Sequence, residues 1–232
     1  MPKLTYRDVF RFVPNLIGYT RVLLTCAAAF SMYYKCPTTM FLSYALSELL
    51  DAADGHYARK LGQCSKFGEV LDMVTDRCTT TILLTYLAEL YNSRPLALVF
   101  NFITVLDISS HYMQMYSQLI TGKTNHKQMN NDAHWILRAY YTDRRVLFAF
   151  CFGNEAFFLL LYVNKFLSST PLYFSIALTV LAFPLFFIKN FINVIQLYES
   201  AKDLAKLDAA ALNNSKDTTA STASRKNTKK KL

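Results

Sequence analysis

The stretch DAADGHYARKLGQCSKFGEVLDMVTD, residues 51–76, places four aspartates inside or beside two otherwise apolar segments. Asp51 and Asp54 are three positions apart, and Asp72 and Asp76 are four positions apart. On helices, these spacings put the members of each pair on one face. A short connection between the segments would let the two helices run antiparallel. We therefore expect all four carboxylates to converge near the edge of a membrane.

Converging carboxylates repel one another unless cations lie among them. Hard oxygen ligands in this number favour Mg²⁺ or Mn²⁺ over zinc, and such a site suits phosphoryl transfer. Gly55 and Gly68 each lie about one turn from an aspartate, where a missing side chain allows close approach. Arg59 lies on the same helical stripe as Gly55 and is suited to hold a phosphate. Alternatively, these aspartates only cap helices or pair with nearby cations. This interpretation explains a single aspartate better than it explains four.

Outside this stretch, the sequence has the pattern of a polytopic membrane protein. Its 232 residues are 53% hydrophobic and only 18% charged, and the charges gather between long charge-poor segments. A bilayer-spanning helix needs roughly 20 consecutive apolar residues. The sequence therefore predicts an all-α fold with six transmembrane helices, over residues 14–34, 37–60, 66–91, 95–119, 146–167 and 170–198.

The two ends of the chain differ from this membrane domain, which we place at residues 14–200. Residues 1–13 combine Arg7 and Arg11 with aromatic residues, which predicts an N-terminal interfacial helix; a frayed helix start is the alternative. The start has no clear signal-peptide pattern, so we expect the first apolar helix to be retained. Residues 201–232 are rich in Ala, Ser, Thr, Asn and Lys, which predicts a disordered basic tail.

The basic residues indicate orientation in a membrane. The net charge of +9 is concentrated in the predicted loops and tail on one side, so both termini are expected to be cytoplasmic. Nucleic-acid binding does not fit a chain with this much apolar sequence. The five cysteines form no CxxC pair, and neither a zinc site nor a disulfide framework is predicted.

The aspartate stretch resembles the signature of the CDP-alcohol phosphatidyltransferase family, D-x2-D-G-x2-A-R-x8-G-x3-D-x3-D. Every defined position is present: Asp51, Asp54, Gly55, Ala58, Arg59, Gly68, Asp72 and Asp76. The resemblance implies a six-helix membrane bundle, usually a homodimer, that uses Mg²⁺ or Mn²⁺. It implies that all four aspartates bind metal, that Asp76 also acts as the catalytic base, and that Gly55, Arg59 and Ser65 contact the CDP part of the substrate. Ser65 is equally well placed to cap the helix that follows it.

The residues between the signature positions indicate one branch of the family. This stretch, together with LDISSHYMQMYS (106–117), LRAYYTDRRVLF (137–148) and GNEAFFLLLY (153–162), is similar to the eukaryotic branch of the family that forms phosphatidylinositol. That branch transfers a phosphatidyl group from CDP-diacylglycerol to myo-inositol and releases CMP. The alternatives are a relative that uses glycerol phosphate, serine, choline or ethanolamine, or an ion-coupled transporter whose carboxylates bind the coupling cation.

Four polar residues in the later spans are candidates for an inositol pocket. Asp107 and His111 are four positions apart on the fourth predicted span, and Asn154 and Glu155 lie in the fifth. A polyol needs several buried donors and acceptors. The alternative is that these side chains satisfy one another within the bundle.

The chain ends in Lys229-Lys230-Lys231-Leu232, which resembles the dilysine signal of endoplasmic reticulum membrane proteins. The expected location is therefore the endoplasmic reticulum membrane, with the Golgi membrane as the alternative. A basic tail attracted to anionic lipid explains the same residues without a signal.

Overall fold

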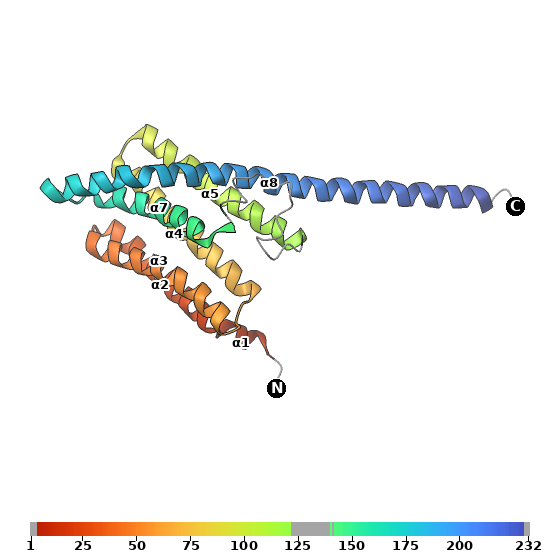
Figure 1. Ribbon diagram of the computed structural model, residues 1–232, viewed down its shortest axis with the longest axis horizontal. Helices are drawn as coiled ribbons and strands as arrows, with labels where there is room; N and C mark the ends of the chain where they lie inside the picture. The colour runs from red at the N-terminus through yellow and green to blue at the C-terminus, as the bar shows by residue number, and fades with distance from the viewer. Residues whose placement is uncertain (1–3, 122–139, 141, 230–232) are drawn as a thin grey trace. The chain divides into compact units, whose positions relative to one another are not determined.

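The computed structural model describes residues 4–121, 140 and 142–229, and the regular structure within these residues is α-helical (Figure 1). The helices are α1 (Tyr6–Phe10), α2 (Val13–Tyr33), α3 (Pro37–Lys60), α4 (Lys66–Tyr91), α5 (Arg94–Thr121), α7 (Arg144–Val163) and α8 (Ser169–Lys229). The predicted all-α fold is confirmed. The bounds of α3 and α4 equal the two predicted segments that carry the aspartates.

The chain forms two compact units. The first unit comprises residues 1–108 and 147–190, and the second comprises residues 109–146 and 191–232. Helices α5, α7 and α8 therefore contribute residues to both. The aspartate stretch and the helices that contact it belong to the first unit.

The turn between α3 and α4 has local signals at both ends. Gly62 has φ +63°, a conformation that glycine adopts without strain, and it follows directly after the end of α3. Ser65 caps α4, because its side-chain oxygen accepts a hydrogen bond from the Gly68 N–H at 3.0 Å. The Val13 N–H donates to the Gln63 side chain at 2.9 Å, so this turn lies beside the start of α2.

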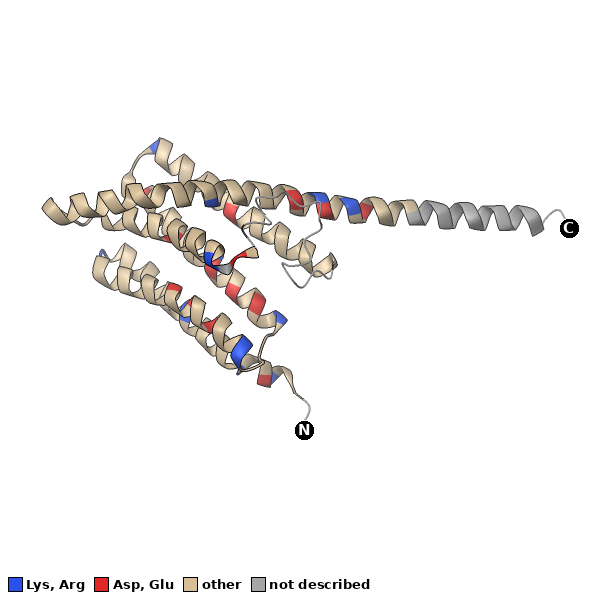
Figure 2. Ribbon diagram, viewed as in Figure 1, with Lys and Arg blue, Asp and Glu red and all other residues tan. Residues whose placement is uncertain are grey.

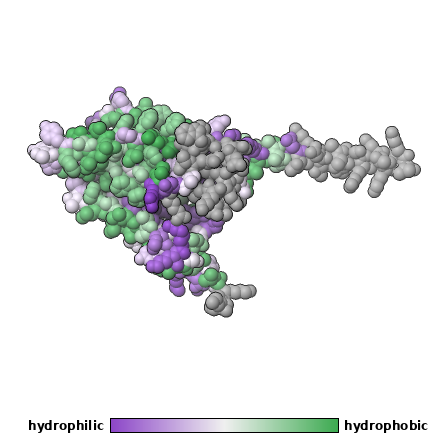
Figure 3. All heavy atoms as spheres, viewed as in Figure 1, coloured by the Kyte–Doolittle hydropathy of each residue, from purple (hydrophilic) through white to green (hydrophobic). Residues whose placement is uncertain are grey.

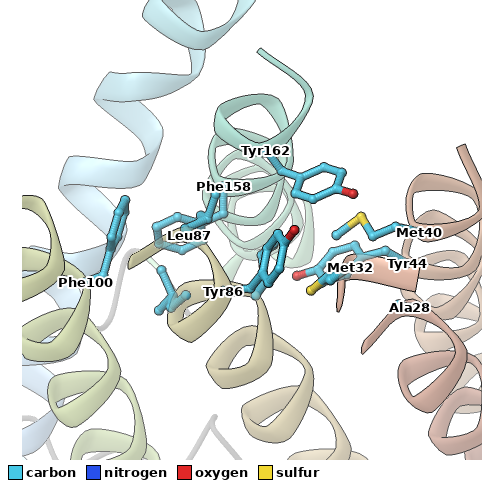
Figure 4. Close-up of a cluster of buried hydrophobic side chains, with 11 residues drawn as sticks. Ala28, Met32, Met40, Tyr44, Tyr86, Leu87, Phe100, Phe158 and Tyr162 are labelled. Carbon is cyan, nitrogen blue, oxygen red and sulfur yellow. The ribbon is translucent and has the colours of Figure 1, made fainter. Parts of the chain in front are cut away.

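The apolar core of the first unit lies near the turn that joins α2 to α3 (Figure 4). Met32 and Met40 flank this turn and are fully buried with Leu87 of α4 and Tyr162 of α7. The rings of Tyr86 and Tyr162 lie 5.9 Å apart. Helix α4 thus starts beside the N-terminal end of α2 and ends in the core near its C-terminal end.

Among the residues that the structure describes, four helices are long and apolar enough to cross a membrane: α2, α5, the Arg145–Val163 part of α7 and the Ser169–Asn213 part of α8. Much of the visible surface is hydrophobic (Figure 3), as lipid contact requires. Helices α3 and α4 have 24 and 26 residues, which is long enough to span, but both carry several charged residues. The six-span count therefore stays a prediction.

The ends of the chain differ in part from expectation. Helix α1 is short, and the ring of Phe10 contacts that of Phe67 at 4.9 Å. Hydrogen bonds from the hydroxyl and N–H of Thr5 lower the pKa of Asp8. Helix α8 continues to Lys229, although residues 201–232 were predicted to be disordered. The alanine, leucine and lysine residues that begin this segment have high helix propensity, which explains the continuation. Helix α7 ends four residues earlier than predicted.

Candidate metal and substrate site

The four signature aspartates come together in the first unit, as predicted. Helix α3 carries Asp51 and Asp54, and helix α4 carries Asp72 and Asp76, as acidic residues on mainly uncharged helices (Figure 2). One carboxylate oxygen each from Asp51, Asp72 and Asp76 lies within 4.8 Å of the other two. Helix α2 packs against both α3 and α4, and the short turn between these two helices lets their aspartates meet beside Arg21 of α2.

A residue that was not predicted, Arg21 of α2, lies among these carboxylates. Its Nη1 atom lies 2.7 Å from Asp51 Oδ1, 3.0 Å from Asp54 Oδ2 and 2.6 Å from Asp72 Oδ1. Its Nη2 atom donates to Asp76 Oδ1. One guanidinium group therefore contacts all four signature aspartates.

The cluster is buried on one side and open on the other. The Arg21 side chain is 1% exposed, whereas those of Asp51 and Asp72 are 41% and 44% exposed. Asp54 is nearly buried, and Asp76 is intermediate. Carboxylate oxygens from two helices that converge and remain partly exposed fit a hard divalent cation such as Mg²⁺ or Mn²⁺.

Two glycines let α2 approach α4 closely enough for Arg21 to reach the cluster. A Cβ atom on Gly18 would lie 2.8 Å from Leu71 Cδ2, and a Cβ atom on Gly68 would lie 2.7 Å from Asn15 Oδ1. Asn15 is itself held, because its Nδ2 donates to the Val9 carbonyl at 2.6 Å. Gly68 is thus a packing residue as well as a signature residue.

The residues expected to contact CDP lie around the same hairpin. Arg59 is exposed near the end of α3 and lies against Gly55, since a Cβ atom there would lie 3.3 Å from Arg59 Nη1. Ser65 caps α4 through its hydroxyl oxygen, so the helix-cap alternative for this residue is confirmed.

Asp107, a candidate for the inositol pocket, is buried and paired. Both its oxygens accept hydrogen bonds from Arg77 Nη1, at 2.5 and 2.6 Å. Nη2 of Arg77 lies 3.5 Å from Asp76 Oδ2. The signature aspartate Asp76 and the candidate Asp107 therefore share one arginine.

The other candidates in the first unit bond to one another. Glu155 accepts hydrogen bonds from the Tyr44 hydroxyl at 2.6 Å, from the Thr80 hydroxyl at 3.2 Å and from Asn154 Nδ2 at 3.1 Å. Asn190 Nδ2 donates to Asn154 Oδ1 at 3.1 Å. Asn154 and Glu155 are thus brought together, and both have partners within the bundle.

His111 belongs to the second unit, whereas the other three inositol-pocket candidates belong to the first. Its Nδ1 atom lies 3.2 Å from the Ser110 hydroxyl.

Sequence reasoning missed Arg21, although a signal was present. Arg21 is the one charged residue within residues 13–34, and a charge inside an apolar span indicates function by default. Asn15, Gly18 and Arg21 also recur at intervals of three, which places them on one side of α2. Arg77 carried a similar signal as a charge inside the predicted span 66–91, and it is one of the nearby cations considered as partners of the aspartates. Tyr44 had no comparable signal, because its partner Glu155 lies 111 residues away in the sequence.

The sequence matches the CDP-alcohol phosphatidyltransferase family over residues 11–198, a range that includes every element of the aspartate site. The chain belongs to this family. Members of the CDP-alcohol phosphatidyltransferase family generally depend on a divalent metal, and the cluster described above has the ligands for one.

Several eukaryotic family members are similar over nearly the whole chain. A Homo sapiens protein named CDP-diacylglycerol–inositol 3-phosphatidyltransferase is 43% identical over 209 residues, which cover 88% of this chain and 95% of that protein. Proteins of the same name from Schizosaccharomyces pombe and Saccharomyces cerevisiae are each 41% identical, and they cover 87% and 93% of this chain and 92% and 96% of their own lengths. No match was found among solved structures.

Proposed function

We propose that the protein transfers the phosphatidyl group of CDP-diacylglycerol to myo-inositol, forming phosphatidylinositol and CMP. The observation that carries the proposal is the convergence of the four signature aspartates on one partly exposed point. The names of the similar eukaryotic proteins support inositol as the acceptor.

Asp51, Asp54 and Asp72 are the proposed metal ligands, with Asp76 as a shared fourth. The bound Mg²⁺ or Mn²⁺ would neutralise the pyrophosphate of CDP-diacylglycerol and stabilise CMP as the leaving group. The chain's own contribution is to hold these carboxylates on two helices whose relative position is set by a short, capped turn. Gly55, Arg59 and Ser65 are the proposed contacts to the CDP part.

Asp76 is the proposed general base. It takes the proton of an inositol hydroxyl, and the oxygen then forms a bond to the phosphorus nearer the diacylglycerol. The bond between that phosphorus and the CMP oxygen breaks, and CMP leaves. Asp76 suits this role because it lies one helical turn beyond Asp72 on the same face of α4.

Asp107, His111, Asn154 and Glu155 remain the proposed inositol-pocket residues. The pairing of Asp107 with Arg77 supports an indirect role for Asp107, in which it orients an arginine near Asp76. We further propose a homodimer in the endoplasmic reticulum membrane with both termini in the cytoplasm, on the basis of the family resemblance and of the basic loops and tail.

The test is a turnover assay with purified protein in detergent or vesicles. CDP-diacylglycerol is supplied with one acceptor at a time: myo-inositol, glycerol phosphate, serine, choline or ethanolamine. We expect CMP release and labelled phospholipid with inositol only. Product with another acceptor would reassign the substrate within the family, and no CMP with any acceptor would favour an ion-coupled transporter.

Metal dependence is tested in the same assay. Treatment with EDTA should abolish turnover, and added Mg²⁺ or Mn²⁺ should restore it, because the four carboxylates need a divalent ion to bind a pyrophosphate. Undiminished turnover in the chelated sample would contradict the metal mechanism.

A further inference from the structure

Arg21 has no role in the proposed chemistry, yet it contacts all four signature aspartates. Nη1 carries two hydrogen atoms, but oxygens of three carboxylates lie 2.6–3.0 Å from it. The hydrogen bonds from Nη1 go to Asp54 and Asp72, and Asp51 faces the same nitrogen atom as an ion-pair partner at 2.7 Å. The guanidinium therefore satisfies the cluster only in part, and a divalent ion with six or more oxygen ligands would satisfy it better.

We propose that Arg21 is a positioning residue that competes with the divalent ion for the carboxylate oxygens. It holds the four aspartates together before the ion binds, and it releases them as the ion enters. This inference rests on the proposed metal site. The physical reason is that two cations repel when they face the same oxygens at close range in a poorly solvated site.

The surroundings of Arg21 are suited to such an exchange. The ion can approach from the side on which Asp51 and Asp72 are exposed, whereas Arg21 reaches the cluster from the buried side. The Arg21 Nε atom has no hydrogen-bond partner among the described residues. Within that part of the chain, the guanidinium is thus held by the aspartates alone, and loss of their oxygens frees it.

The proposal predicts opposite effects on two quantities in Arg21→Gln. The purified variant is stripped with EDTA, exchanged into chelator-free buffer and titrated with Mn²⁺ by calorimetry, and its thermal unfolding is recorded with and without Mn²⁺. We expect the unfolding temperature without metal to fall, because four carboxylates lose their counter-charge. We expect the Kd for Mn²⁺ to decrease about tenfold or more, because each carboxylate no longer has to leave a charged hydrogen bond. A merely structural arginine would, on removal, loosen the site and weaken metal binding.

Two further variants distinguish direct competition for the carboxylate oxygens from the general effect of a nearby positive charge. Arg21→Lys keeps the positive charge, but an ammonium group cannot fork between carboxylates, so its Kd should lie between those of the wild type and Arg21→Gln. Lys66→Gln removes an exposed charge that is paired with Glu69 at 2.9 Å, and it should leave the Kd for Mn²⁺ within about twofold of the wild type.

An unchanged or higher Kd in Arg21→Gln overturns the proposal. If that variant does not fold, Arg21→Lys decides, and a Kd equal to or above the wild-type value overturns it. If the wild type itself binds no Mn²⁺, the metal site of the proposed function fails together with the inference. If the wild type binds Mn²⁺ tightly and Arg21→Gln does not bind it more tightly, the inference about Arg21 fails while the proposed metal site stands.

Discussion

Asp76 has two proposed roles, as a metal ligand and as the base that accepts a proton. Its carboxylate contacts the guanidinium groups of Arg21 and Arg77, and its backbone carbonyl accepts a hydrogen bond from the Thr80 hydroxyl at 3.1 Å. Asp72, one turn earlier, is more exposed and has Arg21 as its ion-pair partner among the described residues. The two aspartates thus have different surroundings despite sharing a helix face.

Replacement of Asp76 should therefore separate the two roles. Asp76→Asn keeps the shape but cannot accept a proton, and we expect turnover to fall about 10²–10⁴-fold while CDP still binds in the presence of metal. Asp72→Asn should instead weaken the binding of metal and CDP together. Steady-state turnover and calorimetric CDP titration on both variants provide the comparison. Near-normal turnover in Asp76→Asn would assign the base to another group, with His111 as the next candidate.

Arg59 offers a second test at the scale of one residue. It is exposed and lies against the side-chain-free surface of Gly55, so it is available to a phosphate. Arg59→Lys keeps the charge but loses the bidentate fork, and we expect the KM for CDP-diacylglycerol to rise roughly tenfold with little change in the KM for inositol. Lys60→Gln, next along the chain, is the control for loss of a nearby charge. An unchanged KM for the lipid nucleotide in Arg59→Lys would leave Arg59 as an ordinary loop charge.

Pairs of helices in the first unit approach closely at glycines. On α7, a Cβ atom at Gly153 would lie 2.5 Å from Leu185 Cβ of α8, an atom that cannot move by rotating a side chain. At Gly55, by contrast, the neighbouring atom is the far end of the Arg59 side chain, at 3.3 Å. A methyl group added at Gly153 should therefore destabilise the protein more than a methyl group added at Gly55.

Gly153→Ala should lower the stability of the protein. Overpacking costs about 1–3 kcal/mol, whereas alanine regains roughly 1 kcal/mol through its higher helix propensity. We expect a net loss of up to about 2 kcal/mol for Gly153→Ala and little loss for Gly55→Ala. Thermal unfolding in detergent measures both. Equal unfolding temperatures for Gly153→Ala and the wild type would show that α7 and α8 have room to separate.

At the scale of the whole molecule, the number of spans depends on whether α3 and α4 cross the membrane. The hydrogen bond from Val13 to Gln63 places the α3–α4 turn beside the start of α2, and the Tyr33 and Tyr86 rings meet 5.4 Å apart near its other end. Helices α3 and α4 therefore extend along most of α2, which is itself long and apolar enough to span. This arrangement favours six spans over four.

The two topologies differ in the position of the α3–α4 turn. With six spans and a cytoplasmic N-terminus, Cys64 faces the cytoplasm and Cys36 faces the lumen, and both cysteines are exposed. We expect a membrane-impermeant maleimide to label a single-cysteine variant that retains Cys64 in sealed microsomes. The variant that retains Cys36 should be labelled only after permeabilisation. Protection of Cys64 in sealed microsomes would support four spans.

The sequence by itself determined the aspartate hairpin and its chemistry. The features that define this hairpin are local in the sequence: the aspartate spacings of three and four residues, the glycines and the Ser65 cap. On a helix, residues at such spacings lie on the same face. Helices α3 and α4 consequently have the predicted bounds, and the four carboxylates converge. The expectation of a disordered tail rests on its polarity, but alanine-rich polar segments also form helices, and α8 extends to Lys229.

Only the tertiary structure decided which groups surround the hairpin. Arg21 is 30 residues or more from every aspartate it contacts, Arg77 pairs with Asp107 across 30 residues, and Tyr44 bonds Glu155 across 111 residues. Such pairs depend on which helices pack together and at what rotation, and helix periodicity sets neither. A charge inside an apolar span indicates that the side chain has a polar partner, but the packing of the helices determines which residue that partner is.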